Sequence, residues 1–553
     1  AIFGCVAHFS RPSRRTCIPV SNRGINCRAM LSTACVPSPV AASGVGWGAT
    51  TGPLACDYLV TSAGVEELAF IDRVLVETQD WTIILADPAA QPGGRWNSAP
   101  PFARLDQPSE FFGVGSRPLD TPHVLRRDEI LQYCHGVVQR FAQLGRVRFF
   151  PMTTFDGRAL CSIVDSDDVR PIRVRRKVVR SLFGPSPSTP LRTFPFHVAA
   201  GSLVVPPKEV QLHAAGHAKY IVIGGGRTGI EVVLWLFKRG VREDQLLWVM
   251  REDMWLIKQG TMTPDSYVET AKAFWSLFAE AETVEAFELG LERAGLRFRI
   301  DTSKRPTAFR AVAVAEQDIA QLRRAAPSII RKGALREVHP ERLVLQHGSV
   351  PTGSGALYID CTADDPEERD IELPPVFEAR QVNLQLVREI ADNGPPSSCF
   401  SAALIGLLEC AEPHDAEAKS ALCTPMAAPA TVVDALRNEL ASMRATGLKA
   451  HPVAGTFLMV GSLGRLAAIG PKATRQLLQD RADKGERDRV LANLERLCAE
   501  GASTPPFSAP GACGGGSRLV SAGGQSEAST VASGAHFDFD ELDRLEQLTL
   551  QQA

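Results

Sequence analysis

The sequence KYIVIGGGRTGIEVVLWLFKRG at residues 219–240 is the strongest indication of the fold class. An apolar strand over residues 220–223 leads into a glycine-rich turn, and a helix with apolar spacing follows over 230–238. Gly240 closes this helix after a basic pair, as is common at helix C-termini. A further apolar strand over 245–250 completes the pattern, which predicts a parallel strand–helix–strand unit.

The turn of this unit carries a GxGxxG pattern in which each glycine has a physical role. The first permits the tight turn, the second lets the backbone approach a pyrophosphate, and the third lets helix and strand pack closely. The start of the helix offers N–H groups and a partial positive charge to the diphosphate. Rather than a plain glycine turn, we predict a dinucleotide site formed by Gly224, Gly225, Gly226, Arg227, Thr228 and Gly229.

The residues after the second strand indicate which nucleotide binds. NAD sites place a carboxylate there for the ribose, whereas NADP sites favour an arginine for the 2′-phosphate. The strand ends on Arg251, whose guanidinium can bind a phosphate with two hydrogen bonds. Glu252 or Asp253 would be the carboxylate of an NAD site if the strand ended later, and Arg251 could be a plain surface charge. We predict NADPH, with Arg251 as a ligand.

An earlier unit of the same kind starts at residue 57, with a strand over 58–61, a helix over 65–78 and a strand over 81–86. Two such units predict an α/β fold with two dinucleotide-binding, Rossmann-like domains. At the end of the second strand, Asp87 stands where the carboxylate for the adenosine ribose belongs, although it could equally cap the turn before the next proline.

The turn of the earlier unit departs from the glycine pattern. Its cofactor-facing positions are Ser62, Ala63 and Gly64, and Glu67 replaces the third glycine. A side chain at a positive-φ position costs about 1–2 kcal/mol, which Ser62 avoids only at negative φ. Glu67 brings a negative charge towards a diphosphate, although a carboxylate in the first turn stabilises the helix itself. The turn therefore suits the fold better than it suits a cofactor.

The sequence QPGGRW at residues 91–96 follows the earlier unit, and its GGxW element resembles the flavin-containing monooxygenases, where this loop passes close to the isoalloxazine. Four further segments are similar to a less-studied family of FAD/NAD(P)-binding oxidoreductases related to them: 102–109, 111–114, 305–307 and 358–364. The resemblance covers about residues 57–430. It implies that the cofactor-binding set includes Gly93, Gly94, Arg95, Trp96, Gln107, Asp360, Thr362 and Ala363.

The resemblance also implies how the domains follow one another. An FAD domain would be made of residues 57–210 and 346–430, with an NADP domain over 211–345 inserted into it. Segment 358–364 would be the strand that returns to the FAD domain. A helical region over 431–500, whose apolar residues have helical spacing, would follow.

The resemblance implies FAD and NADPH as cofactors and an oxidoreductase in which NADPH reduces the flavin. The cofactor supplies the chemistry, so no catalytic side chain is predicted. An FxGxxxHxxxW element is absent before the second fingerprint, so the hydride acceptor stays open between oxygen and an organic substrate. The alternative is a nucleotide-binding pseudoenzyme with a partner-binding role, in which Ser62 and Glu67 abolish FAD retention.

Composition excludes several classes of protein. The chain has 553 residues, 44% hydrophobic and 22% charged, as in soluble globular proteins. A net charge of -2 gives no case for nucleic acid, and no apolar run is long enough to span a membrane, so the expected partner is a small-molecule substrate. None of the 13 cysteines forms a CxxC pair, and His213 and His217 lack a third ligand, so no metal is predicted.

Three further segments stand out by composition. Residues 1–56 lack Asp and Glu and are rich in Arg and Ser, which is typical of an organelle-targeting leader; upstream sequence before Met30 is the alternative, and the protein is otherwise expected in the cytoplasm. Residues 501–553 predict a disordered tail, whose acidic end is either a partner-binding helix or a solvated terminus. The basic run over 173–180 alternates with valines and predicts the solvent face of an edge strand.

Overall fold

The computed structural model describes residues 54–503, apart from positions 120, 122, 184–193, 262, 363–372, 389–396, 412–414, 446, 462 and 482. Most of the predicted leader, Ala363 and the tail from residue 504 therefore lie outside the described residues. The first strand, β1 (Leu54–Val60), begins inside the stretch that was assigned to the leader. Within the described part of the chain, no helix has the length and apolarity needed to cross a membrane.

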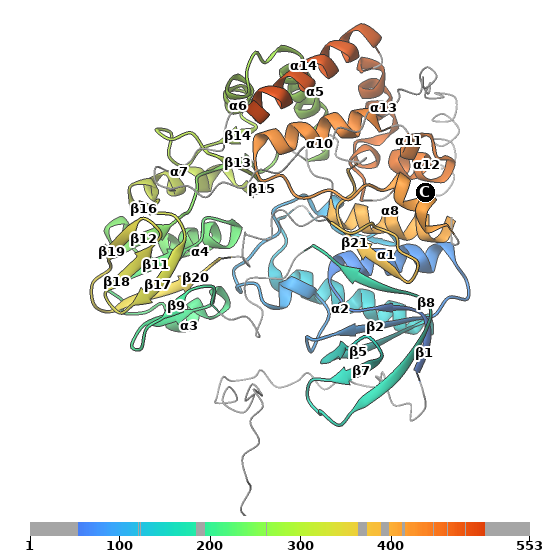
Figure 1. Ribbon diagram of the computed structural model, residues 1–553, viewed down its shortest axis with the longest axis horizontal. Helices are drawn as coiled ribbons and strands as arrows, with labels where there is room; N and C mark the ends of the chain where they lie inside the picture. Colours follow the sequence, from blue (N-terminus) through green and yellow to red (C-terminus); the bar gives the residue numbers. More distant parts are fainter. Residues whose placement is uncertain are drawn as a thin grey trace, which may run out of the picture. The chain divides into compact units, whose positions relative to one another are not determined.

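The first sheet contains the earlier nucleotide unit, and its strands run in the order β5-β2-β1-β8-β7-β6, with β21 also paired to β8. Strands β5, β2, β1, β8 and β21 are mutually parallel, and the hairpin β6–β7 adds antiparallel strands (Figure 1). The bounds are β2 (Ile83–Asp87), β5 (Val147–Pro151), β6 (Thr153–Phe155), β7 (Ala159–Ser162), β8 (Val169–Ser181) and β21 (Gln381–Leu384).

The basic run lies on β8, and the prediction of an edge strand is wrong. Strand β8 pairs with β1 on one side and with β7 and β21 on the other, so it is an interior strand. Its Lys177 is buried, and Lys177 and Lys419 both bind the buried carboxylate of Glu409, which also accepts the Tyr58 hydroxyl. Arg173, Arg175 and Arg180 are exposed, as the predicted solvent face requires, so the prediction is wrong for the edge position and for Lys177.

Three helices cover the first sheet: α1 (Val65–Glu77), α2 (Arg127–Gln143) and α8 (Ser398–Ala411). Helix α8 packs closely on α1 because Gly406 has no side chain; a Cβ atom there would lie 3.0 Å from the Phe70 carbonyl oxygen. Short elements complete this part of the chain, namely β3 (Gly113–Val114), β4 (Arg117–Pro118), β9 (His197–Val198) and α3 (Val210–His213).

The second sheet contains the GxGxxG unit and is entirely parallel, in the order β10-β20-β11-β12-β16. Figure 1 shows these strands side by side in green and yellow, with α4 against them. The bounds are β10 (Leu203–Val205), β11 (Lys219–Ile223), α4 (Arg227–Lys238), β12 (Leu246–Val249), α7 (Glu316–Arg324), β16 (Ile329–Ile330) and β20 (Ala356–Asp360). Two parallel sheets flanked by helices confirm the predicted α/β fold class.

Strand β20 corrects the prediction that segment 358–364 returns to the FAD domain. It lies between β10 and β11 in the second sheet, in register from Lys219 opposite Ala356 to Ile223 opposite Asp360. All five residues of β20 are buried, so its backbone N–H and C=O groups need hydrogen-bond partners on both edges of the strand. Strand β11 pairs with one edge and β10 with the other. The predicted boundary at residue 346 therefore cuts through the second nucleotide unit.

A small sheet with two helices is inserted between β12 and β16 and was not predicted. It consists of β13 (Met254–Lys258), β14 (Arg297–Phe298) and β15 (Ala308–Val314), with α5 (Pro264–Glu280) and α6 (Val284–Arg293). A further sheet of β17 (Leu335–His339), β18 (Arg342–Leu345) and β19 (Gly348–Pro351) pairs with β9 and packs on the second sheet.

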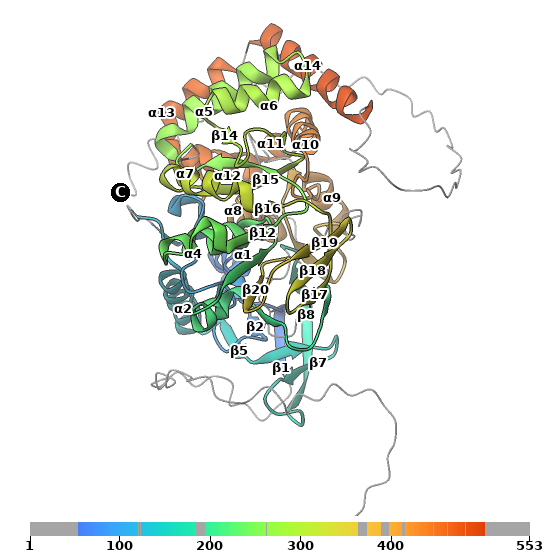
Figure 2. The ribbon, with the colours of Figure 1, turned by 90° about the vertical axis from the view of Figure 1, so that its left-hand side faces the viewer.

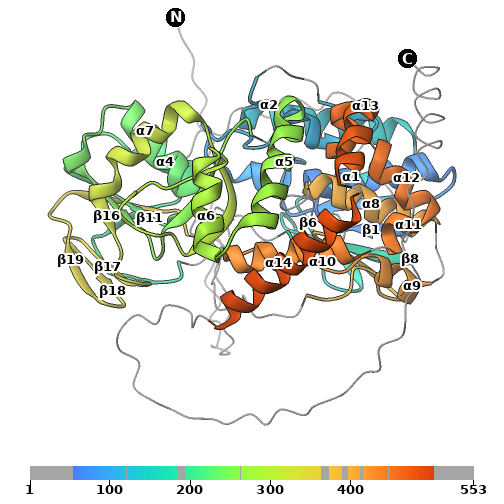
Figure 3. The same cartoon turned by 90° about the horizontal axis from the view of Figure 1, so that it is seen from above.

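The C-terminal helices are α9 (Ala416–Leu422), α10 (Val432–Arg444), α11 (Gly447–Ala450), α12 (Pro452–Val460), α13 (Arg465–Asp480) and α14 (Lys484–Ser503). Helices α10, α13 and α14 pack against this insertion, whereas α12 packs on α8. Figures 2 and 3 show α14 alongside α5, α6 and α10, and one apolar cluster joins these helices through Phe274, Phe287, Leu436 and Leu494. Helix α10 is thereby fixed where its Asp434 and Arg437 face the cavity described below.

Candidate nucleotide-binding site

The second turn, between β11 and α4, contains two glycines, Gly224 and Gly229, that leave no room for a side chain. Gly224 has a φ of +117°, and a Cβ atom on it would lie 2.6 Å from the Cys361 carbonyl oxygen. A Cβ atom on Gly229 would overlap the carbonyl oxygen of Gly224. Gly226, in contrast, has open space around its Cα, on the side where a ligand would approach. The glycine roles predicted from the pattern match this geometry.

The N-terminus of α4 is free of acidic residues and of side-chain caps. Gly226 is the N-cap and makes no side-chain hydrogen bond, and the first helical turn carries no Asp or Glu. The helix starts at Arg227, earlier than predicted, so Thr228 and Gly229 lie in its first turn. Unsatisfied N–H groups and the helix dipole at such an end stabilise a bound phosphate.

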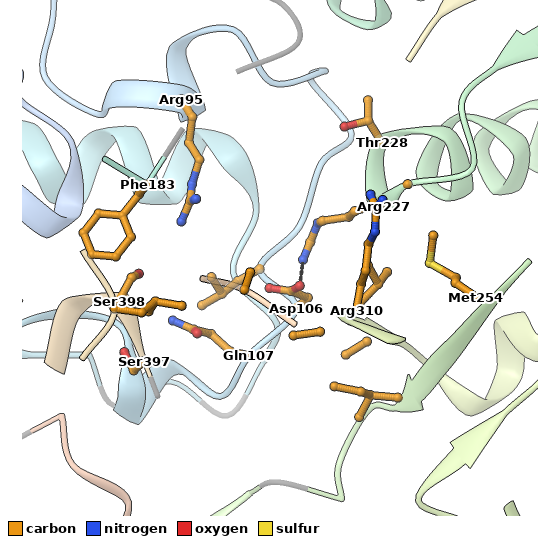
Figure 4. Close-up of a pocket in the computed structure, with 18 of the residues that line it drawn as sticks. Arg95, Asp106, Gln107, Phe183, Arg227, Thr228, Met254, Arg310, Ser397 and Ser398 are labelled. Carbon is orange, nitrogen blue, oxygen red and sulfur yellow. Dashed lines mark ion pairs between the residues drawn. The ribbon is translucent and has the colours of Figure 1, made fainter. Parts of the chain in front are cut away.

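Arg227 connects this turn to the loop that carries Gln107. Its guanidinium forms an ion pair with Asp106, donates to the Arg104 carbonyl oxygen, and lies 3.0 Å from a Glu231 carboxylate oxygen (Figure 4). Phe102 of the same loop stacks on Trp235 of α4, with ring centroids 5.1 Å apart. The two nucleotide units therefore meet at the start of α4.

Arg251 lies just beyond β12, and Arg310, which the sequence did not predict at this site, lies on the other side of Glu252. Its side chain is 40% exposed and lines the cavity. Glu252 lies 3.9 Å from Arg251 and 3.5 Å from Arg310, which comes from β15 of the inserted sheet. Asp253 points elsewhere, since both its oxygens accept from Arg331 at 2.6 and 2.8 Å. Two guanidinium groups thus flank one carboxylate.

The first turn, between β1 and α1, is packed against the GGxW loop. The Gly93 N–H donates to the Ala63 carbonyl oxygen at 2.8 Å, and a Cβ atom on Gly94 would lie 2.7 Å from the Gly64 Cα. Gly93 and Gly94 both have positive φ, whereas Ser62 does not, so Ser62 costs no backbone strain. The structure brings these predicted residues together.

Two carboxylates occupy the first turn of α1. Glu66 is 5% exposed and Glu67 is 2% exposed. A Glu66 oxygen accepts from Arg95 at 2.8 Å and from the Ser398 hydroxyl at 2.9 Å. The Glu67 carboxylate lies directly over Gly64, where a Cβ atom would overlap it. Burial, and then the charge of Glu66, raise the pKa of Glu67 to about 7, although hydrogen bonds with Ser181 and Ser62 act in the opposite direction.

Asp87, at the end of β2, serves the turn. It is 3% exposed, and its two oxygens accept the backbone N–H groups of Ala63 at 2.5 Å and Ala89 at 2.6 Å. Burial raises its pKa. This is the geometry of a turn cap, the alternative that the sequence left open, and a contact with a ribose stays a prediction.

The remaining predicted residues lie in different places. Gln107 lines the cavity and donates to the Phe111 carbonyl oxygen, whereas Trp96 is buried against Phe112. The Asp360 carboxylate accepts from the Thr362 N–H at 3.0 Å and hydroxyl at 2.6 Å. Asp360 is the last residue of β20 and Thr362 follows the strand beside the second turn, so they are not part of the first unit as the resemblance implied.

One cavity of about 3100 Å³ is lined by both turns. Sites for a single small molecule usually measure about 300–1,000 Å³, so this space exceeds the need of one ligand. Figure 4 shows Arg95, Gln107, Ser397 and Ser398 with Phe183, and Arg227, Thr228, Met254 and Arg310 around the same space. Sequence reasoning missed Phe183, Arg310, Ser397 and Ser398, which reach the cavity only through the tertiary fold. In the part of the chain that the structure describes, no group of three His, Cys, Asp or Glu could hold a metal ion.

Comparison with known proteins gives relatives in sequence, although no protein-family model matches the chain. "Uncharacterized protein Rv2000" of Mycobacterium tuberculosis (strain H37Rv) is 36% identical over 415 residues, which cover 70% of this chain and 74% of that protein. "Uncharacterized protein Mb2023" of Mycobacterium bovis matches to the same extent. The chain belongs to the family of these mycobacterial proteins. We call this group the Rv2000-like family, and the names of its members state no activity.

Solved structures similar to this member of the Rv2000-like family include flavin monooxygenases. A flavin-containing monooxygenase from Stenotrophomonas maltophilia is 13% identical with a TM-score of 0.39, over 65% of this chain and 98% of that one. A polycyclic ketone monooxygenase from Thermothelomyces thermophila is 12% identical with a TM-score of 0.44, over 82% and 89%. These values are low, so the functional argument rests on the residues of this chain.

Proposed function

We propose that the protein is a flavoprotein oxidoreductase that takes hydride from NADPH. The observation that carries the proposal is that both nucleotide turns line one cavity of about 3100 Å³. A hydride donor on the second turn and an acceptor on the first would share one space bounded by protein. Such a space holds two reactants close together and restricts water around them.

The second turn suits NADPH on three counts. Gly224 and Gly229 permit the tight turn, Gly226 leaves open space for a diphosphate beside the backbone, and the acid-free start of α4 stabilises its charge. Arg251 and Arg310 lie on either side of Glu252, where a 2′-phosphate would replace the carboxylate as their shared anion. In this proposal Arg251 and Arg310 bind the 2′-phosphate.

The first unit fits a dinucleotide on one condition. The backbone of Ala63, Gly64 and Gly94 is closely packed without strain at Ser62, and Arg95 and Gln107 line the cavity beside it. The condition is that Glu67 carries no charge, because its carboxylate lies over Gly64 where the diphosphate would bind. When bound there, FAD would supply hydride transfer to oxygen or to an organic substrate.

The side chains of this chain hold and orient rather than exchange protons. Ser397, just before α8, donates to the Phe111 carbonyl oxygen, and Ser398, the first residue of α8, donates to Glu66, so both are fixed at the cavity wall. Asp106 pairs with Arg227 at the start of α4, and Phe102 stacks on Trp235 of the same helix, so the loop with Gln107 lies against the second turn. The protein's contribution would be to align two cofactors and a substrate, consistent with the absence of a predicted catalytic residue.

An absorption spectrum tests the proposal. Purified protein, incubated with excess FAD at pH 6 and freed of unbound flavin at the same pH, should show flavin bands. Anaerobic NADPH should bleach these bands, and NADH should bleach them more slowly. Bands that NADPH leaves unchanged would contradict the hydride transfer. Protein that binds NADPH but no FAD would favour the pseudoenzyme alternative, which the two carboxylates of the first turn make worth testing.

A further inference from the structure

The first turn of α1 holds two neighbouring carboxylates with different environments. Glu66 is compensated, since Arg95 forms an ion pair with it at 2.8 Å and Ser398 donates to it at 2.9 Å. Glu67 is more deeply buried, and its hydrogen bonds come from the hydroxyls of Ser62 and Ser181. Among the described residues, no basic side chain forms an ion pair with Glu67. Burial without a cation favours the neutral form of a carboxylic acid.

The other groups around Glu67 do not supply a positive charge either. Asp87 on β2 already accepts two backbone N–H groups. Cys134 of α2 and Cys399 of α8 are buried, which raises the pKa of both thiols far above neutral pH and keeps them uncharged. Arg95, half exposed, is the cation of this cluster and is shared with Glu66. The charge of the site at neutral pH therefore depends on the proton of Glu67.

We propose that Glu67 sets the affinity of the first unit for a flavin dinucleotide, excluding the diphosphate as a carboxylate and admitting it as a neutral acid. This inference rests on the proposed function, because it assumes that the first turn is the flavin site. The diphosphate of FAD carries two negative charges and must approach the backbone of Gly64, which the Glu67 side chain overlies. A neutral acid can donate a hydrogen bond to a phosphate oxygen, whereas a carboxylate repels it.

The proposal fixes the direction of the pH dependence. Because the pKa of Glu67 is raised to about 7, the neutral acid predominates below that pH and the carboxylate above it. A bound diphosphate favours the neutral acid further, and by linkage the proton favours the diphosphate. FAD should therefore bind more tightly at pH 6 than at pH 8, and its dissociation constant should rise by up to about tenfold for each pH unit above 7. At pH 8 the flavin would exchange with solution rather than stay bound.

The test is a titration of FAD, followed by quenching of flavin fluorescence at pH 6, 7 and 8. The wild type is compared with Glu67→Gln, which keeps the volume and removes the charge, and with Glu67→Gly, which restores the glycine of the pattern. His123→Gln is the control, because His123 is an exposed titratable residue that lines the same cavity and pairs with Glu129. NADPH is titrated into the same samples.

We expect the wild type and His123→Gln to bind FAD up to about tenfold more weakly at pH 8 than at pH 6. Glu67→Gln should bind it with equal affinity at both pH values, and at pH 8 up to about tenfold more tightly than the wild type. A wild type whose affinity is the same at pH 6 and 8 would overturn the proposal, even if both variants failed to fold. So would FAD binding by no form of the protein; NADPH binding in those samples would then show that the second site is intact and that the failure lies in the flavin site.

Discussion

The two nucleotide turns share a backbone plan and differ in charge. At the second turn, three glycines and an acid-free helix start leave the N-terminus of α4 open to an anion. At the first turn, a glycine is present at position 64, and Gly94 packs against its backbone. However, Glu66 and Glu67 lie in the first turn of α1. The fold requires close backbone packing at both turns. A dinucleotide would also require that no negative charge lie beside its diphosphate. The difference shows that a nucleotide fold can persist while the electrostatics of one site change.

The largest effect is expected from Gly229→Ala, which breaks the second turn. The new Cβ atom would overlap the Gly224 carbonyl oxygen, a backbone atom that cannot move aside. Overpacking of this kind costs about 1–3 kcal/mol of the free energy of unfolding. We expect NADPH affinity to fall by about a hundredfold, as measured by nucleotide fluorescence, with the loss of stability seen in urea denaturation. Gly226→Ala is the matched control for stability, because its Cα faces open space at negative φ; equal destabilisation by both changes would refute the packing argument.

The next effect is on nucleotide selectivity at the second turn. Arg251→Ala removes a guanidinium from the proposed 2′-phosphate site, and hydrogen bonds to charged groups contribute about 1.5–3 kcal/mol. We expect NADPH to bind about tenfold or more weakly and NADH to change by less than about threefold. Arg310→Ala should have the same sign. Equal losses for both nucleotides would remove the case for a 2′-phosphate site between these arginines.

The sequence predicted those parts of the two sites whose residues are adjacent along the chain, and missed those that tertiary packing brings together. The glycine roles at Gly224 and Gly229 were predictable because strand, turn and helix are contiguous. The place of β20 was not, because the segment after residue 345 gives no sign of which sheet edge its buried strand will join. Arg310 and Ser398 reach the cavity from an unpredicted insertion and from α8, and the pairing of Arg95 with Glu66 joins a loop to a helix. Contacts of this kind depend on tertiary packing, which composition and spacing do not encode.

A smaller effect is expected from Glu66→Gln, which tests whether the charge of Glu66 raises the pKa of Glu67. The charge of Glu66 helps to raise the pKa of Glu67, so its removal should lower that pKa. The midpoint of the pH dependence of FAD binding should therefore move to lower pH. The lost ion pair with the half-exposed Arg95 should change the free energy of unfolding by less than about 1 kcal/mol. A midpoint that moves to higher pH would contradict the coupling between the two carboxylates.

The smallest effect is expected from Asp106→Asn at the contact between the units. Arg227 and Asp106 are both partly exposed, and such ion pairs contribute at most about 1 kcal/mol. Arg227 would keep Glu231 as a partner. We expect a loss of less than about 1 kcal/mol in urea denaturation, and NADPH affinity within about threefold of the wild type. A loss several times larger would mean that this pair, rather than the Phe102–Trp235 stack, holds the loop on α4.

The most direct test of the contrast between the turns is a parallel titration of FAD and NADPH into the wild-type protein at pH 6 and pH 8. We expect the two nucleotides to respond differently to pH. FAD should bind up to about tenfold more weakly at pH 8, where Glu67 is mainly a carboxylate. NADPH should bind equally or more tightly there, because the first turn of α4 carries no acidic residue and a phosphate monoester loses its second proton near pH 6. Two nucleotides that respond to pH in the same direction and to the same extent would contradict the assignment of different electrostatics to the two sites.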